Sequence, residues 1–283
     1  MTNQFRRRSK VRGVAIRNTV IMLLLFFITL EKTHAQAQQK TLKASVVKID
    51  ITPTDSQNLL GYGPRMSTGT HDPIFHKIVA LDDGNTQFFL ISSDICLISP
   101  AEYDRVAGRI QKQYGIDPVN VWWTVTHTHS APEVGSPGMY ATYLADRLVE
   151  LDPAYTNMME QKLIDGIGEA RQKLVPARLG TGWGFSQANI NRRAIDVDGK
   201  ASLGLNPDGP VDRRIGLIRI DKEEGSPLAL IANYAIHGTV LGPQNTLISG
   251  DAPGDGFGNG IKAEALRTTV ARDHTCVWPG CKR

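Results

Sequence analysis

The segment HKIVALDDGNTQFFLISSD, residues 76–94, constrains the fold more than any other stretch of the chain. Two apolar runs with strand-like patterning flank the turn sequence Asp82-Asp83-Gly84. An Asp-Gly step between apolar runs is typical of a β-hairpin, because both residues accept the backbone conformations that a tight turn requires. A second pair of apolar runs, IGLIRID and PLALIANYAIHG, flanks the turn sequence KEEG and predicts another hairpin.

Two helices are expected between and after these strands. Ser99 and Pro100 are typical of a helix start and predict a helix from Ala101 to about Tyr114, ended by Gly115. Asp152-Pro153 predict a second helix that keeps helical apolar spacing up to Pro176. We expect further strands at LKASVVKIDITP and NVWWTVTHTH, and a loop over residues 185–213. Strands mixed with helices and partly joined as hairpins predict an α/β fold, with a mixed β-sheet flanked by helices.

The N-terminal segment has the three parts of a secretory signal. Several basic residues precede the apolar run TVIMLLLFFITL, and small residues that suit cleavage follow around Ala35 and Ala37. The run is shorter than the ~20 residues of a bilayer-spanning helix. We therefore interpret residues 1–37 as a signal peptide that exports the protein to the periplasm or the extracellular space. An uncleaved membrane anchor is the alternative.

Charge and cysteine content exclude two classes of function. The net charge is +4, but residues 1–35 hold seven Lys or Arg against one acid, so the remainder carries −2. No nucleic-acid partner is therefore expected. Of the three cysteines, Cys96 lies in an apolar run and is predicted to be a small buried residue. Cys276 and Cys281 have no second half-site with which to form a metal knuckle.

Histidines stand at the ends of two expected strands. Side chains two apart on a strand share a face, which places His127 and His129 on the same side. His237 ends another apolar strand, directly before Gly238. If both strands belong to one sheet, these imidazoles meet at its carboxyl edge and form a metal site at the strand ends. Neutral imidazole is a good zinc ligand. Histidines that are merely hydrogen-bonded at strand ends remain the alternative from the residues themselves.

Four segments resemble the neutral/alkaline non-lysosomal ceramidase family. GYGPRMSTGTHDP, TVTHTHSAP, ANINRR and NYAIHGTVLGPQNTLISGDAPG occur in the order seen in that family, between Lys43 and Gly254. The resemblance implies that residues 40–254 form part of the N-terminal ceramidase domain. It also implies that His127 and His237 bind Zn²⁺, that His129 beside the metal is catalytic, and that Arg192 binds polar groups of the substrate.

The reaction implied by the resemblance is hydrolysis of the N-acyl amide of ceramide (N-acylsphingosine), or of a related amide, with water activated by zinc. The partner is then a lipid-like small molecule, and association with a membrane surface is expected. The oligomeric state stays open. A secreted, non-catalytic lipid- or glycan-binding protein on the same fold is the rival interpretation.

The chain departs from the family pattern near its end. In the family the remaining zinc ligands, a glutamate and a tyrosine, come from segments well downstream, and this chain has no counterpart of them. Residues 255–283 lack the expected apolar runs and are interpreted as a divergent or frameshifted tail. We therefore expect an incomplete N-terminal portion that is inactive as it stands. Asp94, Glu133 and Asp251 are acids that could supply a third ligand, and Asp94 could instead orient a ligand histidine.

Overall fold

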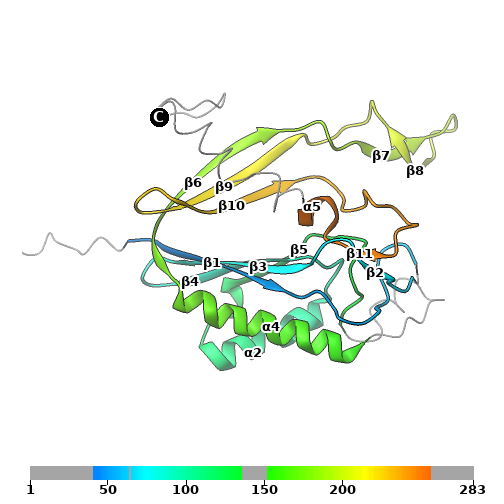
Figure 1. The fold of residues 1–283 in the computed structure, drawn as a ribbon. Helices are drawn as coiled ribbons and strands as arrows, with labels where there is room; N and C mark the ends of the chain where they lie inside the picture. The colour runs from blue at the N-terminus through cyan, green and yellow to red at the C-terminus, as the bar shows by residue number, and fades with distance from the viewer. Residues whose placement is uncertain (1–40, 64, 136–151, 256–283) are drawn as a thin grey trace, which may run out of the picture. The chain divides into compact units, whose positions relative to one another are not determined.

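The computed structural model describes residues 41–63, 65–135 and 152–255 (Figure 1). Its main feature is a seven-stranded sheet in the order β10-β9-β6-β1-β3-β4-β5. The strands are β1 (Lys43–Asp50), β3 (Phe75–Asp82), β4 (Gln87–Ser93), β5 (Val121–Val125), β6 (Val175–Phe185), β9 (Arg214–Lys222) and β10 (Pro227–Tyr234). β4 and β5 are parallel and the other pairs antiparallel. The expected mixed sheet and both expected hairpins, β3–β4 and β9–β10, are confirmed.

Two helices cover one face of the sheet, and local sequence explains where each begins. In α2 (Pro100–Tyr114) the Ser99 side chain accepts a hydrogen bond from the Glu102 amide, and the helix ends at Gly115 in a left-handed conformation. In α4 (Pro153–Gln172) the Asp152 side chain accepts from the amides of Ala154 and Tyr155. Both helix predictions are thus confirmed. α2 is the crossover that makes β4 and β5 parallel.

The main core lies between these helices and the sheet. Alternate residues of β3 divide between two faces: Ile78 and Ala80 face the helices, while Val79 and Leu81 face away from them. The largest side chains buried at the helix-covered face are apolar: Phe89, Ile91, Ile110, Met159, Leu163, Ile164 and Ile167. Burial of this apolar surface is the dominant stabilising contribution to the fold.

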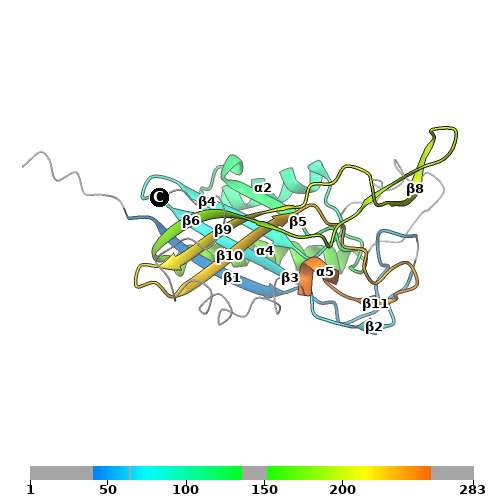
Figure 2. The ribbon, with the colours of Figure 1, turned by 90° about the horizontal axis from the view of Figure 1, so that it is seen from above.

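The remaining three strands fold back over the other face of the sheet. β6 pairs with β1 through two residue pairs, Lys43–Pro176 and Ala44–Val175, and then continues along β9. Figures 1 and 2 show β6, β9 and β10 as a layer across β1 and β3, opposite the helices. A second, smaller apolar cluster of Ala44, Val79, Ala177 and Ile220 joins the two layers. This fold-back allows the end of β10 to approach the end of β5.

The structure contradicts one sequence expectation and adds a strand that the sequence does not predict. Residues 185–213 do not form a loop throughout, because they contain the hairpin β7 (Asn191–Ile195) and β8 (Ala201–Asn206). The turn between these strands contains Gly199. β6 is not predicted by the sequence pattern either, since its sequence VPARLGTGWGF contains three glycines and lacks a clear apolar run.

Short elements complete the described chain: the 3-10 helix η1 (Pro118–Asn120), the strands β2 (Gly69–Thr70) and β11 (Leu247–Ile248), and the five-residue helix α5 (Asp251–Asp255). No helix among the described residues combines the length and apolarity of a membrane-spanning segment. The predicted signal peptide at residues 1–37 and the predicted tail beyond Asp255 lie outside the described residues.

Candidate metal centre

The strand that carries the His-Thr-His sequence is shorter than its alternation suggests. β5 ends at Val125, and the chain then follows the neighbouring strand by other hydrogen bonds: Thr126 donates to the Ser93 carbonyl and His127 to the Ile95 carbonyl. His127 adopts a left-handed backbone with φ 58°. The prediction that His127 and His129 belong to a strand is therefore wrong, and strand alternation is not what brings these side chains together. A positive φ outside glycine is uncommon and is found preferentially at functional sites.

The His127 ring is fixed through its Nδ1 atom. This nitrogen lies 2.7 Å from the carbonyl oxygen of Cys96. Because a carbonyl can only accept, Nδ1 carries the proton, and the lone pair stands on Nε2. Ligand histidines in metal sites are characteristically anchored in this way. His127 thus presents Nε2 in the form that a cation needs.

His237 reaches the same place from a loop that follows β10, which ends three residues earlier at Tyr234. The two histidine-bearing segments are joined directly by backbone hydrogen bonds, His129 N to Gly238 O at 3.0 Å and Ser249 N to Ser130 O at 2.8 Å. A Cβ at position 238 would lie 3.1 Å from the His127 carbonyl oxygen, so a side chain there would be tightly packed and glycine favours this close approach.

The three imidazoles converge. The Nε2 atom of His129 lies 2.9 Å from Nε2 of His237, 108 positions later in the chain, and 3.5 Å from Nε2 of His127. The ring centroids of His127 and His237 are 4.7 Å apart. Nitrogen ligands at zinc–nitrogen distances of 2.0–2.1 Å in a tetrahedron are separated by about 3.3 Å. The side chains present therefore fit a small divalent cation.

His129 is held differently from His127. Its Nδ1 atom is buried and has no hydrogen-bond partner among the described residues. Packing fixes the ring instead, because the edge-on ring of Tyr62 lies 4.8 Å away between centroids. Gly61, at φ 117°, lies so close that a Cβ there would overlap the imidazole. The absence of an anchored Nδ1 makes His129 less typical of a ligand than His127.

Desolvation favours the neutral form of two of the three histidines, His129 and His237. Desolvation, followed by the neighbouring histidines and Arg65, lowers the pKa of His129 to about 4. The pKa of His237 is also lowered, chiefly by desolvation and then by His127 and the positive charge of Arg192. Neutral imidazoles are the form that binds metal.

Cys96 adjoins the cluster but is a poor candidate ligand. One atom each of Cys96, His127 and His129 lie within 4.8 Å of one another, which is compatible with a metal site. Against this, desolvation and the nearby charge of Glu133 raise the pKa of the Cys96 thiol to about 12. The thiol also faces Nδ1 of His127, which is already bonded to a carbonyl. Cys96 is buried, as predicted from its apolar context.

Two of the three acids that the sequence offers as a third ligand, Asp94 and Asp251, bind other partners. Asp94 lies 3.0 Å from the Lys77 ammonium and accepts from the Phe75 amide, so it orients no histidine. Asp251, with φ 54°, accepts from the amides of Val240 and Leu241. Glu133 is buried, which raises its pKa. Among the described residues, the group of possible ligands that meets within 4.8 Å is Cys96, His127 and His129, and it includes neither a carboxylate nor His237.

Arg192 stands on β7 with an exposed side chain. Its Nε donates to the Gly204 carbonyl at 3.1 Å. The structure brings its charge near enough to His237 to lower the pKa of that histidine.

Other polar residues have structural roles. His76 is fully buried in β3, with Nδ1 2.6 Å from Ser93 Oγ and Nε2 3.0 Å from the Met159 carbonyl. His71 is exposed and paired with Asp72. Ser130 is buried, and its hydroxyl accepts from the Asn245 side chain at 3.0 Å.

Sequence reasoning does not find the residues that support His129. Gly61, Tyr62 and Arg65 belong to GYGPR, a segment that contributes to the family resemblance but suggests no role for these side chains. The local signal in GYGPR is two glycines and an aromatic residue in an irregular loop, and this pattern does not show that the segment packs against His129.

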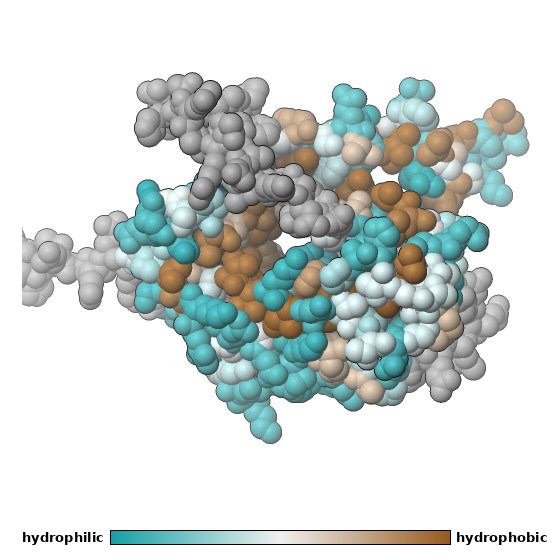
Figure 3. Space-filling view, in the orientation of Figure 1, coloured by the Kyte–Doolittle hydropathy of each residue, from teal (hydrophilic) through white to brown (hydrophobic). Residues whose placement is uncertain are grey.

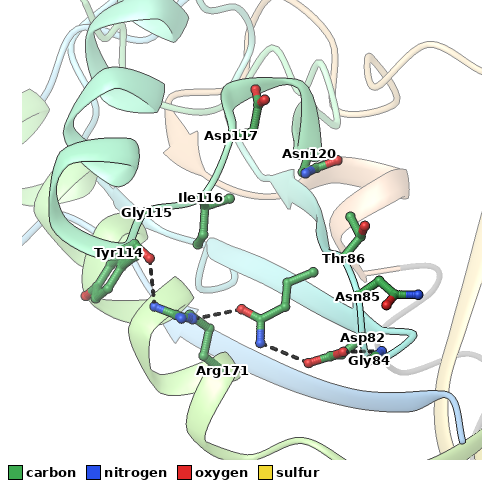
Figure 4. A pocket seen from close by; sticks show the side chains of 11 residues that line it. Asp82, Gly84, Asn85, Thr86, Tyr114, Gly115, Ile116, Asp117, Asn120 and Arg171 are labelled. Atoms are coloured by element: carbon green, nitrogen blue, oxygen red, sulfur yellow. Dashed lines mark hydrogen bonds between the residues drawn. The ribbon is translucent and has the colours of Figure 1, made fainter. Parts of the chain in front are cut away.

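A hollow of about 400 Å³ lies at the opposite end of β4, at the β3–β4 turn (Figure 4). Its lining includes Gln87, Tyr114 and Arg171, which are joined by hydrogen bonds from Arg171. It is separate from the histidines, because β4 runs from Gln87 at this end to Ser93 beside the cluster.

Residues 43–258 match the sequence profile described as "Neutral/alkaline non-lysosomal ceramidase, N-terminal". The chain belongs to this family. It is 28% identical over 260 residues to neutral ceramidase A of Dictyostelium discoideum, covering 86% of this chain and 36% of that protein. It is 29% identical to the neutral ceramidase of Mycobacterium tuberculosis over 69% of this chain and 32% of the relative.

Solved structures of ceramidases share the fold. Neutral ceramidase from Pseudomonas aeruginosa superposes with a TM-score of 0.63 at 22% identity, over 76% of this chain and 35% of that chain. A ceramidase complexed with C2 gives the same TM-score at 23% identity. The family recognised from four short segments is thus confirmed. The chain spans about a third of the length of the curated relatives it matches.

Proposed function

We propose that this chain carries the histidine part of a zinc-dependent amidohydrolase site that acts on the N-acyl amide of ceramide or a related lipid amide. The observation that carries the proposal is the convergence of three Nε2 atoms, with those of His127 and His237 both within 3.5 Å of that of His129. Membership of the ceramidase family supports the substrate class.

His127 and His237 would hold the zinc ion. His127 does so through Nε2, because its Nδ1 is bonded to the Cys96 carbonyl. When bound, zinc supplies a Lewis acid that polarises an amide carbonyl and acidifies water. The remaining ligands are proposed to come from glutamate and tyrosine segments of the kind described above for the family.

His129 is the proposed proton-transfer group. It lies beside both proposed ligands, and no hydrogen bond of its Nδ1 to a described residue fixes its protonation. Its lowered pKa favours the neutral imidazole, which has a lone pair that can accept a proton. A leaving amine requires a proton donor, and the protonated ring can be that donor.

The surroundings suit an amphiphilic substrate. Arg192 offers a guanidinium to hydroxyl and carbonyl groups. The same hairpin exposes large aliphatic side chains, among them Ile195 and Leu203, which suit acyl chains or a membrane surface. Figure 3 shows apolar surface in the part of the view that β6, β7 and β8 occupy.

Metal analysis of the purified full chain tests this function. After dialysis against buffer with trace zinc, the wild type should retain one zinc per chain, and His127→Ala and His237→Ala should lose it. His71→Ala is the matched control, because this exposed histidine pairs with Asp72 outside the cluster. Retention of zinc in either cluster variant would reject that residue as a ligand.

Turnover is tested with an N-acylsphingosine, with an intact family member as the positive control. We expect this chain to bind zinc but to hydrolyse the substrate far more slowly than the intact relative. Equal rates would contradict the proposed incompleteness. Ligand binding without metal would instead favour a non-catalytic binding protein.

Export is also part of the proposal and rests on the N-terminal sequence. Expression in a bacterial host followed by fractionation and mass measurement should recover the protein outside the cytoplasm, cleaved near Ala35 or Ala37. An uncleaved cytoplasmic product would contradict it.

A further inference from the structure

Arg65 joins both histidine-bearing segments to a third loop. Its Nη2 donates to the carbonyl oxygen of His129 at 2.6 Å. Its Nη1 donates to the carbonyl oxygens of Pro243 at 3.2 Å and Asn245 at 3.1 Å. One guanidinium thus fixes the chain at His129 relative to the segment that follows His237. A planar fork with several donors suits this task, and a lysine ammonium cannot reproduce its geometry.

Arg65 also acts on the ring of His129 through Tyr62. The guanidinium carbon lies 4.9 Å from the centroid of the Tyr62 ring, and that ring packs edge-on against His129 at 4.8 Å. The Tyr62 hydroxyl donates to the Thr239 carbonyl at 3.3 Å, two residues after His237. Backbone and imidazole of His129 are therefore both held by the same pair of side chains.

Burying the Arg65 guanidinium next to the histidines costs free energy, which argues against a chance contact. Desolvation lowers the pKa of Arg65, and its Nε is buried without a hydrogen-bond partner among the described residues. A fixed positive charge next to a cation site is also unfavourable by Coulomb's law. If the side chain at position 65 served only to close a loop, a charged residue would not be needed, since a neutral amide can also donate to carbonyls.

We propose that Arg65 is a positioning residue that holds His129 and the loop after His237 in place, so that His129 stands beside a cation bound by His127 and His237 without rearrangement. The proposal rests on the proposed function, in which these imidazoles surround a divalent cation. In this role Arg65 is not itself a ligand and acts through His129 and Tyr62.

Arg171 provides a matched control at the other end of the sheet. Its Nε donates to Gln87 Oε1 at 2.9 Å and its Nη1 to the Tyr114 carbonyl at 3.3 Å (Figure 4). Its guanidinium carbon lies 5.5 Å from the Tyr114 ring centroid. Arg65 and Arg171 thus share the same kinds of contact, and of the two only Arg65 adjoins the histidines.

The experiment compares the wild type with Arg65→Met, Arg65→Lys and Arg171→Met in the full chain. Zinc affinity is measured by competition with a chromophoric chelator, and thermal stability is measured on the zinc-free proteins. Loss of a partner that orients a metal-binding group typically weakens metal affinity about 10- to 100-fold. We expect a loss of roughly that size in Arg65→Met, a smaller loss in Arg65→Lys, and none in Arg171→Met. The zinc-free Tm of Arg65→Met should fall no further than that of Arg171→Met.

Hydrogen–deuterium exchange gives a readout that does not depend on zinc. The His129 amide donates to the Gly238 carbonyl, so Arg65→Met should accelerate exchange in peptides spanning residues 127–131 while leaving α4 unchanged. If Arg65→Met fails to fold, Arg65→Lys serves for both measurements.

Two outcomes overturn the role of Arg65: zinc affinity and exchange like the wild type, or losses in affinity and Tm that parallel those of Arg171→Met. Failure of the wild type to bind zinc would instead reject the proposed metal site. The exchange measurement would then still decide whether Arg65 orders His129.

Discussion

The helix-covered half of the sheet and the histidine loops beyond the strand ends are held together by different forces. Between α2, α4 and the strands, fully buried apolar side chains such as Phe89 and Leu163 account for the packing. In the histidine loops, short directional contacts replace this apolar packing. The Cys96 carbonyl orients His127, and Arg65 donates to the His129 carbonyl. Two residues there, His127 and Asp251, adopt a positive φ.

The difference explains how one chain separates stability from site geometry. Apolar burial is non-directional and scales with area, so the core tolerates small displacements. A metal site does not tolerate such displacements, because its ligand atoms must lie within a few tenths of an ångström of fixed distances from the metal. Substitutions in the core should therefore change the free energy of unfolding, and substitutions in the loops should change zinc affinity.

Leu163→Ala should produce the largest effect. Leu163 is fully buried in α4, and its truncation leaves a cavity that costs about 2–5 kcal/mol in the free energy of unfolding. Chemical denaturation measures this loss. Zinc affinity, measured well below the transition, should match that of the wild type. A large loss of affinity would show that the two regions are not separable.

His76→Gln should remove about 1–3 kcal/mol at pH 7, because the buried contacts of the imidazole with Ser93 Oγ and the Met159 carbonyl cannot both be kept. Trp123 Nε1 still donates to Ser93 Oγ. Burial lowers the pKa of His76 to about 4 from the ordinary 6.5. The folded state therefore resists protonation, and the contribution of His76 is complete above pH 6.5 and is lost as the pH falls toward 4. Denaturation across this range should show the wild-type advantage narrowing. A constant difference would contradict the assignment.

Gly61→Ala should act on the site rather than the core. A Cβ at this position overlaps the His129 ring, and φ 117° disfavours any side chain. The displaced His129 ring, whose Nε2 lies 2.9 Å from Nε2 of the proposed ligand His237, should disturb that ligand. We expect zinc affinity to fall roughly 10- to 100-fold, as for loss of an orienting partner.

Gly108→Ala is the control for that substitution, because Gly108 lies in α2 and no neighbouring atom stands within 4 Å of the place that an alanine Cβ would occupy. It should stabilise the fold by about 0.5–1 kcal/mol and leave zinc affinity unchanged. Equal zinc affinity in Gly61→Ala and Gly108→Ala would mean that His129 does not depend on its glycine neighbour.

Ser99→Ala should weaken the fold less than Leu163→Ala or His76→Gln. The Ser99 hydroxyl accepts from the Glu102 amide at the start of α2, and loss of such a cap costs about 1 kcal/mol. The loss should appear in the unfolding midpoint and leave zinc binding as it is. A change in zinc binding would show that α2 transmits strain to the loops.

The sequence predicts the helix-covered half of the sheet well and the histidine loops poorly, because only structure that depends on local signals can be recognised in a sequence. Turn residues at Asp82–Gly84, the cap at Ser99 and the Asp152–Pro153 start are local signals, and each element forms where expected. β6 and the β7–β8 hairpin escape prediction, because glycine and polar residues leave no periodic apolar pattern.

In the site, the sequence identifies the histidines but not the way they meet. Strand alternation predicts a shared face for His127 and His129, whereas a left-handed residue and a carbonyl contact bring their Nε2 atoms together. The contribution of Arg65 depends on contacts 64 and 180 positions away, which no local pattern encodes.

Diffraction from zinc-soaked crystals at the zinc absorption edge tests the central claim most directly. We predict one anomalous peak about 2.0–2.1 Å from the Nε2 atoms of both His127 and His237, with His129 alongside. A peak at the Cys96 sulfur at about 2.3 Å, or no peak at these imidazoles, would contradict it.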